Sequence, residues 1–325
     1  MSNFKYYPFF QPDFELPIYC NSAYLSKISN NYGWVIDEHN KLGIPIIIKS
    51  KLLFKIVIPY GSVYDVTNNT ICNSSEKLNV FYENLIDFFK KELNIDAILP
   101  SPAYVITPIV PYKTNFASFG TLRIDLFQSV EVLWDNLHHK HRNSVRMAEK
   151  LNCDFIVDNN LLDEAIQIIN KTHIREKITL VNRKIFTNNS SFKVIAVTNE
   201  NSIQSVAIYL FSNEGAYYLY GSNADKHING SMNFLHWNAL LYFKELNVKN
   251  YDFVGVRIGE DISEKYITLR RFKSRFGGSL VEGYMWKIEL SLRFKIVKYL
   301  IKSFNFILGK KTFDLVDSIN LKQKQ

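Results

Sequence analysis

The order of apolar and polar positions predicts that the first part of the chain is built mainly from strands. Short runs rich in β-branched residues are separated by polar turns that contain Asn40 and Gly43, the pattern of successive strands. Strands are predicted at 34–37, 44–48, 53–58, 97–99 and 121–126. Between them, apolar residues recur with a helical period from Leu78 to Phe89, after N-cap candidates at 73–76. The residues before Trp34 are aromatic, and we expect them to be irregular.

A helical and strongly basic segment follows from Ser129. Its apolar residues, among them Leu133, Val145 and Ala148, share one side of a helix. The other side carries His138, His139, Lys140, His141, Arg142, Arg146 and Lys150. We expect one long helix here, which forms the hinge between two halves of the chain.

The pattern of the first half then recurs. Helices are predicted at 161–171 and 234–246, and strands at 192–197, 204–210, 216–220 and 251–254. Each half thus contains a meander of strands, a helix and a further strand, which indicates a diverged duplication. The expected fold class is α/β with mixed sheets, in two tandem domains at 1–145 and 146–290. Residues 291–325 are expected to form a basic amphipathic helix and a tail.

That last helix is open to two interpretations. Its apolar residues, such as Leu292, Ile296 and Leu300, alternate with Arg293, Lys295, Lys298 and Lys302. A basic amphipathic helix of this kind can lie on an anionic membrane surface. It can equally pack one face on the neighbouring domain, and the sequence leaves both interpretations open.

Composition narrows the class of protein. The chain has 325 residues, of which 47% are hydrophobic and 14% aromatic, enough for one large or two ordinary packed domains. A net charge of +8 favours polyanionic partners such as tRNA, nucleotide-sugar phosphates or an anionic membrane, without choosing among them. The three cysteines form no CxxC pair, so neither a disulfide framework nor a zinc site is indicated. The first residues do not resemble a signal peptide, and we expect a cytoplasmic protein, with the inner face of the membrane as an alternative location.

Three motifs occur in order between residues 120 and 285. The first comprises Leu122–Leu126, Leu133-Trp134 and the basic run Lys140–Lys150. The second comprises Tyr220-Gly221-Ser222, Asn233–Leu240 and Tyr251–Gly255. The third is Leu269–Gly278, which contains the sequence RFKSRFGG.

Together these motifs resemble those of FemAB-like peptidyltransferases and the related acetyltransferase-like proteins of polysaccharide loci. They are similar to the family's "DL…R..IRKA.K" helix, its "GS…P..LLQW…YDFGG" block and its "FK..FGG" signature. The family is a variant of the GNAT fold, usually with two such domains. Two departures stand out: Asn233 replaces the proline of the second block, and Val254 is inserted before Gly255.

The resemblance implies an N-acyltransferase. Its co-substrate would be aminoacyl-tRNA or acyl-CoA, with no bound cofactor. The acceptor would be an amine on a nucleotide- or lipid-linked cell-envelope precursor, in peptidoglycan or surface-polysaccharide synthesis. Such a reaction needs a neutral attacking amine, positioning and positive charge near the developing oxyanion, but no enzyme nucleophile. The chain has no G-x-S-x-G elbow, and the loop 222–231 lacks the glycine spacing of coenzyme A users, which favours aminoacyl-tRNA as the donor.

The resemblance supplies one candidate site residue, and strand position and clustered positive charge supply the others. Lys273, the lysine of "FK..FGG", would lie near the acyl-transfer centre, where it holds a phosphate or stabilises the oxyanion. Asp252, at the end of the predicted strand 251–254, could orient the attacking amine or accept its proton. The candidate substrate-binding residues are Arg142, Arg146, Tyr220, Arg257, Arg271 and Arg275.

Each of these assignments has a structural alternative. Lys273 could be a surface lysine on a strand between two core phenylalanines. Asp252 could cap a helix or pair with Arg257. Arg142 and Arg146, one helical turn apart, could pair with acidic neighbours, and Tyr220 could be a pocket wall.

Two further points limit the functional hypothesis. The histidines His138, His139 and His141 have no carboxylate beside them to complete a metal site, so no metal is expected. A non-catalytic binding protein that keeps the fold is the alternative to an enzyme. The enzymatic hypothesis requires that the RFKSRFGG segment, expected as a strand, and the basic helix border one shared crevice, where the Lys273 ammonium meets an anionic reactant.

Overall fold

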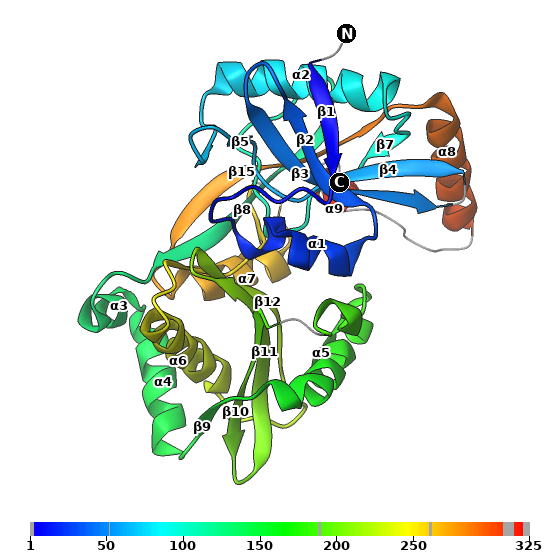
Figure 1. Ribbon diagram of the computed structural model, residues 1–325. Coiled ribbons are helices and arrows are strands. Elements are labelled where there is room, and N and C mark those ends of the chain that lie inside the picture. Colours follow the sequence, from blue (N-terminus) through cyan, green and yellow to red (C-terminus); the bar gives the residue numbers. More distant parts are fainter. Residues whose placement is uncertain (1–2, 52, 188–189, 260–261, 308–314, 321–325) are drawn as a thin grey trace. The chain divides into compact units, whose positions relative to one another are not determined.

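The structure is a computed structural model that describes residues 3–51, 53–187, 190–259, 262–307 and 315–320 (Figure 1). The chain divides into two compact units. Unit 1 comprises 1–120, 255–267 and 282–325, and unit 2 comprises 121–254 and 268–281. These units differ from the expected contiguous domains, because the strand that completes the sheet of unit 1 comes from near the C-terminus. The expected boundary at 145/146 falls inside a helix of unit 2, and residues 291–325 belong to unit 1.

The sheet of unit 1 has the order β1-β2-β3-β4-β7-β15. Its strands are β1 (Phe4–Pro8), β2 (Tyr32–Asp37), β3 (Leu42–Lys51), β4 (Phe54–Pro59), β7 (Ala97–Ile98) and β15 (Ser279–Glu289). The first four are antiparallel, whereas β4 and β7 are parallel and pair at only two positions. Two short strands, β5 (Tyr64–Asp65) and β6 (Thr70–Ile71), extend from β3, and β14 (Val256–Arg257) pairs with β8 (Asn115–Asp125).

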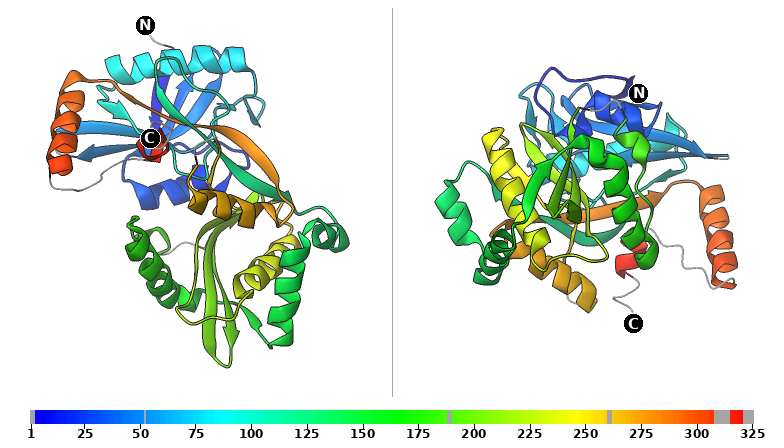
Figure 2. Two further views of the ribbon diagram at one scale, coloured as in Figure 1. Left: turned by 180° about the vertical axis from the view of Figure 1, so that it is seen from behind. Right: turned by 90° about the horizontal axis from the view of Figure 1, so that it is seen from below.

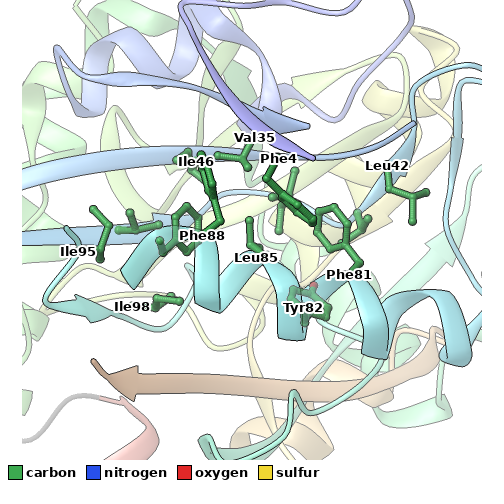
Figure 3. Close-up of a cluster of buried hydrophobic side chains, with 14 of the residues drawn as sticks. Phe4, Val35, Leu42, Ile46, Phe81, Tyr82, Leu85, Phe88, Ile95 and Ile98 are labelled. Atoms are coloured by element: carbon green, nitrogen blue, oxygen red, sulfur yellow. The ribbon is translucent and has the colours of Figure 1, made fainter. Parts of the chain in front are cut away.

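The core of unit 1 lies between this sheet and α2 (Ser75–Lys91). Ser74 caps the helix, because its side chain accepts a hydrogen bond from the main-chain N–H of Lys77. In Figure 3, Phe81, Leu85 and Phe88 of α2 lie against side chains of the sheet such as Val35, and all four are buried. The predicted helix and strands are confirmed here. The residues before Trp34 are irregular only in part, because they include β1 and α1 (Ser22–Ile28).

Unit 2 repeats the plan of unit 1. Its sheet has the order β9-β10-β11-β12-β13-β8, with the part of β8 after Gly120 at the end. Its strands are β9 (Asp154–Val157), β10 (Phe192–Asn199), β11 (Ser202–Ser212), β12 (Gly215–Asn223) and β13 (Asn250–Asp252). As in unit 1, an antiparallel meander is followed by a helix and one parallel strand. The mixed α/β fold class and the repeated order of elements are therefore confirmed.

The helices of unit 2 are α3 (Val130–Asn136), α4 (His139–Lys150), α5 (Leu162–Glu176) and α6 (Ser231–Glu245), with the last part of α7 (Glu264–Ser274). Figure 2 shows α5 on one face of this sheet and α6 on the other, with α4 beside α6. Short 3₁₀ helices occur at Ile18–Cys20, Asn159–Leu161 and Arg183–Ile185.

Two expected elements were wrong. The long basic helix is interrupted at Leu137, whose backbone is extended and whose side chain is buried, so α3 and α4 are separate helices. Arg142 stabilises the break, because its Nη1 atom donates to the carbonyls of Trp134, Asp135 and Leu137 at the end of α3. The RFKSRFGG segment is not a strand: it forms the last turns of α7 and the turn before β15.

The C-terminal part of unit 1 contains α8 (Leu292–Ile307) and α9 (Leu315–Asn320). The predicted amphipathic helix is thus present, although side chains beyond Ile301 within α8 lie outside the described residues. Among the described residues, no helix is both long and apolar enough to cross a bilayer.

Candidate active site at the fork of two parallel strands

The candidate site of unit 2 begins where β12 and β13 separate. The two strands pair in parallel only at Ala216 with Tyr251 and at Tyr217 with Asp252. Beyond these pairs β12 continues to Asn223, whereas β13 ends. A β-bulge lies on β12 next to these pairs. Ile208 and Tyr209 are consecutive on β11 but pair with Tyr220 and Tyr218, so β12 has one extra residue between its two partners. Ligands of α/β proteins bind at the carboxyl ends of parallel strands, and bulges often lie beside such sites.

A turn with an unusual backbone follows β13. Val254 has φ +49° and Gly255 has φ +55°, both in the left-handed region. This conformation is costly for a β-branched residue, so the surrounding structure has to stabilise it. The valine that departs from the family's "YDFGG" block is therefore the residue that carries the backbone strain.

Asp252 is one of the residues that stabilise this turn. Its side chain is fully buried, and its Oδ1 atom accepts hydrogen bonds from the Val254 N–H at 2.8 Å and from Thr121 Oγ1 at 2.5 Å. Its Oδ2 atom accepts from Nε and Nη2 of Arg123, each at 3.2 Å. The ion-pair partner of Asp252 is thus Arg123 and not Arg257. These four bonds occupy the carboxylate, a geometry that favours positioning over proton transfer.

Lys273 meets the same turn from α7. Its side chain is 6% exposed, and Nζ donates to the carbonyl of Phe253 at 2.8 Å and to that of Val254. Burial lowers the pKa of Lys273 to about 8, while the charge of Asp252 acts in the opposite direction. The lysine is therefore a buried cation at the end of a helix and not a surface lysine on a strand.

A buried histidine, His236 of α6, lies behind the turn. Its Nδ1 atom is 2.6 Å from the hydroxyl of Tyr251 and 3.3 Å from that of Tyr209, and the two hydroxyls are 2.7 Å apart. Burial, with a smaller contribution from the charge of Lys273, lowers the pKa of His236 to about 3, so the imidazole is neutral near pH 7. Its Nε2 atom has no hydrogen-bond partner among the described residues. The sequence analysis did not single out this residue, although a histidine within an apolar helix was a visible signal.

The basic helix and the RFKSRFGG segment lie beside each other in unit 2, which meets one part of what the enzymatic hypothesis requires. The main-chain N–H of His138 donates to the carbonyl of Arg275 at 2.8 Å, and Nε2 of His141 is 3.0 Å from the carbonyl of Phe272. The His141 ring also packs against Phe276, with 4.5 Å between ring centres. Burial lowers the pKa of His141 to about 4.

The other candidate residues lie in several places. Arg146 stacks over the ring of Trp134 at 5.3 Å, and Arg142 caps α3 as described. Tyr220 is half-buried on β12 next to the bulge, and its pKa is raised by burial. Arg271 is exposed and Arg275 half-buried at the end of α7.

Arg257 belongs to unit 1 and is held there. Its Nη2 atom donates to Ser318 Oγ at 3.1 Å, and its guanidinium stacks over Tyr266 at 3.7 Å. Burial lowers its pKa. These two partners lie within its own unit.

In the part of the chain that the structure describes, no three His, Cys, Asp or Glu side chains are arranged to hold an ion. The rings of His138 and His139 stack at 4.2 Å between centres without such a third ligand.

Comparison with known proteins identifies the fold. No protein-family model matches the sequence, and neither does any curated protein. Among solved structures, FemX is similar at a TM-score of 0.57 and 13% identity, covering 78% of this chain and 87% of that one. L-PGS from Bacillus licheniformis is similar at a TM-score of 0.52 and 12% identity, covering 85% of this chain and 90% of that one. A conserved protein of unknown function from Bacteroides thetaiotaomicron is similar at a TM-score of 0.52 and 12% identity, covering 83% of this chain and 90% of that one. The resemblance to the FemAB-like group is therefore confirmed at the level of the fold.

Proposed function

We propose that the chain is an N-acyltransferase whose reaction takes place at the fork of unit 2. The observation that carries this proposal is the buried Lys273, which brings a positive charge to the turn that follows the parallel strands. A charge held in a desolvated place acts more strongly on a developing anion than one in water. The FemX-like fold supports the same class of reaction.

In the proposed reaction an amine nitrogen attacks the carbonyl carbon of an activated acyl group. The C–N bond forms, the carbonyl oxygen becomes an oxyanion, and the ester oxygen or thioester sulfur then leaves with a proton that the amine has lost. Lys273 supplies positive charge to the oxyanion or to a phosphate of the reactants. Asp252 and Arg123 do not contact the reactants in this proposal. They hold the turn whose carbonyls, at Phe253 and Val254, bind the lysine.

Aminoacyl-tRNA is the donor that we propose. A coenzyme A pyrophosphate would require free N–H groups at the start of the helix after β12, which is α6. That end is closed: Ser231 is fully buried, and its hydroxyl is 2.6 Å from Ser205 Oγ. Gly230, with φ +92°, packs so closely on Ser144 that a Cβ would lie 2.6 Å from the Ser144 carbonyl oxygen. The single glycine of the loop 222–231 therefore serves helix packing, and the net charge of +8 suits a polyanionic donor.

The proposed acceptor is an amine of a nucleotide- or lipid-linked cell-envelope precursor, either a peptidoglycan stem peptide or an amino sugar of a surface polysaccharide. To test both reactants, purified protein is incubated with labelled aminoacyl-tRNAs or labelled acyl-CoA and a panel of such precursors. Products are then identified by mass spectrometry. We expect an aminoacyl mass on the acceptor. Transfer from acyl-CoA alone would refute the proposed donor.

One observation favours a second candidate function, that of a binding protein without catalysis. The polar atoms of Asp252 and two donors of Lys273 are bound to groups of the fold itself. Binding of tRNA or precursor with no turnover in the same assay would identify this alternative.

A further inference from the structure

The helix α8 has an unusual outward face. Its exposed apolar side chains are each more than half accessible: Leu292, Ile296, Tyr299, Leu300 and Ile301. The first four follow the spacing i, i+4, i+7, i+8 and so form one stripe. A surface helix of a globular protein normally turns such a stripe toward the core.

Contacts made by other residues of α8 hold the helix in this orientation. The Phe294 ring packs against Phe54 with 5.2 Å between centres. Arg293 donates to both carboxylate oxygens of the buried Asp96, at 2.7 and 2.9 Å, and Lys298 pairs with Glu289 at 2.6 Å. All these partners belong to unit 1, so the stripe cannot turn inward without breaking them.

A residue outside α8 extends the apolar surface. Leu53 is 83% exposed and directly precedes Phe54, the residue on which α8 packs. Figure 1 shows α8 beside β4. We call Leu53 together with Leu292, Ile296, Tyr299 and Leu300 the apolar stripe.

Positive charge accompanies the apolar stripe. By sequence, α8 carries four basic residues and no acidic one. Asp96 and Glu289 neutralise two of them, while Lys295 is exposed among the apolar residues. A second copy docking through this face by two-fold symmetry would bring like charges together, whereas anionic lipid headgroups would complement them.

We infer that the apolar stripe is a docking surface for an anionic membrane. The helix lies in the plane of the bilayer interface, its leucine and isoleucine side chains enter the boundary of the acyl chains, and its lysines meet the headgroups. This inference goes beyond the proposed reaction and holds whichever donor and acceptor unit 2 uses.

The test uses full-length protein and two matched variants. Ile296 of α8 and Val80 of α2 are both 51% exposed on helices of unit 1, so Ile296→Asp and Val80→Asp place the same charge in equivalent positions. Binding is measured by co-sedimentation with phosphatidylcholine vesicles with and without phosphatidylglycerol. Circular dichroism checks the fold of each variant.

We expect wild-type protein to bind only the anionic vesicles, and to bind less as salt rises. Ile296→Asp should weaken this binding at least tenfold, equivalent to about 1.4 kcal/mol, while Val80→Asp should leave it unchanged. Equal binding of Ile296→Asp and wild type, or no binding by folded wild type, would overturn the inference. So would a lipid-free dimer, detected by analytical ultracentrifugation, that Ile296→Asp dissociates.

The outcome is independent of the acyl-transfer assay. Activity on soluble nucleotide-linked acceptors should persist in Ile296→Asp, because the residue lies in unit 1, outside the fork of unit 2. Vesicle binding without catalysis would contradict only the proposed function, and catalysis without vesicle binding only the docking surface.

Discussion

The replacement Asp252→Asn tests whether the buried carboxylate holds the strained turn. The asparagine can still accept from Thr121 and the Val254 N–H through its oxygen, but its NH₂ group then faces Arg123 in place of Oδ2. Two charge-assisted hydrogen bonds are lost, and a buried amide group is left opposite a cation. Since hydrogen bonds to charged groups contribute about 1.5–3 kcal/mol and an unsatisfied buried group costs a similar amount, we expect destabilisation of about 3 kcal/mol.

The chain offers a matched control for this prediction. Asp163 forms the same kind of two-bond contact with Arg183 in unit 2, at 2.5 and 3.0 Å, but both side chains are more than half exposed. Exposed ion pairs contribute little to the free energy of unfolding, so Asp163→Asn should change it far less than Asp252→Asn.

The assay is urea unfolding followed by tryptophan fluorescence, with thermal melting as a second measurement. For a unit of this size, a loss of about 3 kcal/mol lowers the melting temperature by roughly 6–12 °C. If Asp252→Asn unfolds at the same urea concentration as Asp163→Asn, the argument that the carboxylate stabilises the turn is refuted.

Three further predictions concern the same unit. The pKa of Lys273 is lowered from 10.5 to about 8, so between these pH values the unfolded chain binds more protons than the folded chain. The free energy of unfolding should therefore rise with pH across this window, and Lys273→Met should remove that rise in urea titrations. The pKa of His141 is lowered to about 4, so its contribution to the free energy of unfolding should decrease as the pH falls from 6.5 toward 4. His141→Gln, whose amide can still donate to the Phe272 carbonyl, should make the free energy of unfolding less dependent on pH in this range. Gly277→Ala should destabilise by about 1–3 kcal/mol in chemical unfolding, since φ is +85° and the new Cβ would lie 2.6 Å from Asn136 Cβ; a neutral effect would contradict the left-handed turn.

Many helices and strands were predictable because each is specified by the pattern of apolar and polar residues within its own segment. The α2 stripe and the β-branched runs of β10 and β11 carry their period in the sequence, and the structure confirms them. The break between α3 and α4 was not predictable in this way. No glycine or proline marks it, and it depends on the burial of Leu137 and on the reach of Arg142 back to three carbonyls.

The candidate site was predicted in part. Lys273 and Asp252 were named as catalytic candidates from separate motifs, and both contact the turn at Val254. The segment of Lys273 was expected as a strand because its phenylalanines and basic residues show no clear helical stripe. Its burial depends on residues far apart in the sequence, as does the hydrogen bond of His236 to Tyr251. Single-sequence patterns carry no information about such pairings.

The central claim is that the positive charge of Lys273 serves acyl transfer at the fork of unit 2. Single-turnover transfer from labelled aminoacyl-tRNA to the acceptor measures this directly, in wild type, in Lys273→Met and in Lys90→Met as an exposed control on α2. Loss of one stabilising donor should slow transfer at least about 100-fold in Lys273→Met, with Lys90→Met at the wild-type rate. A folded Lys273→Met protein that transfers as fast as wild type would contradict the claim.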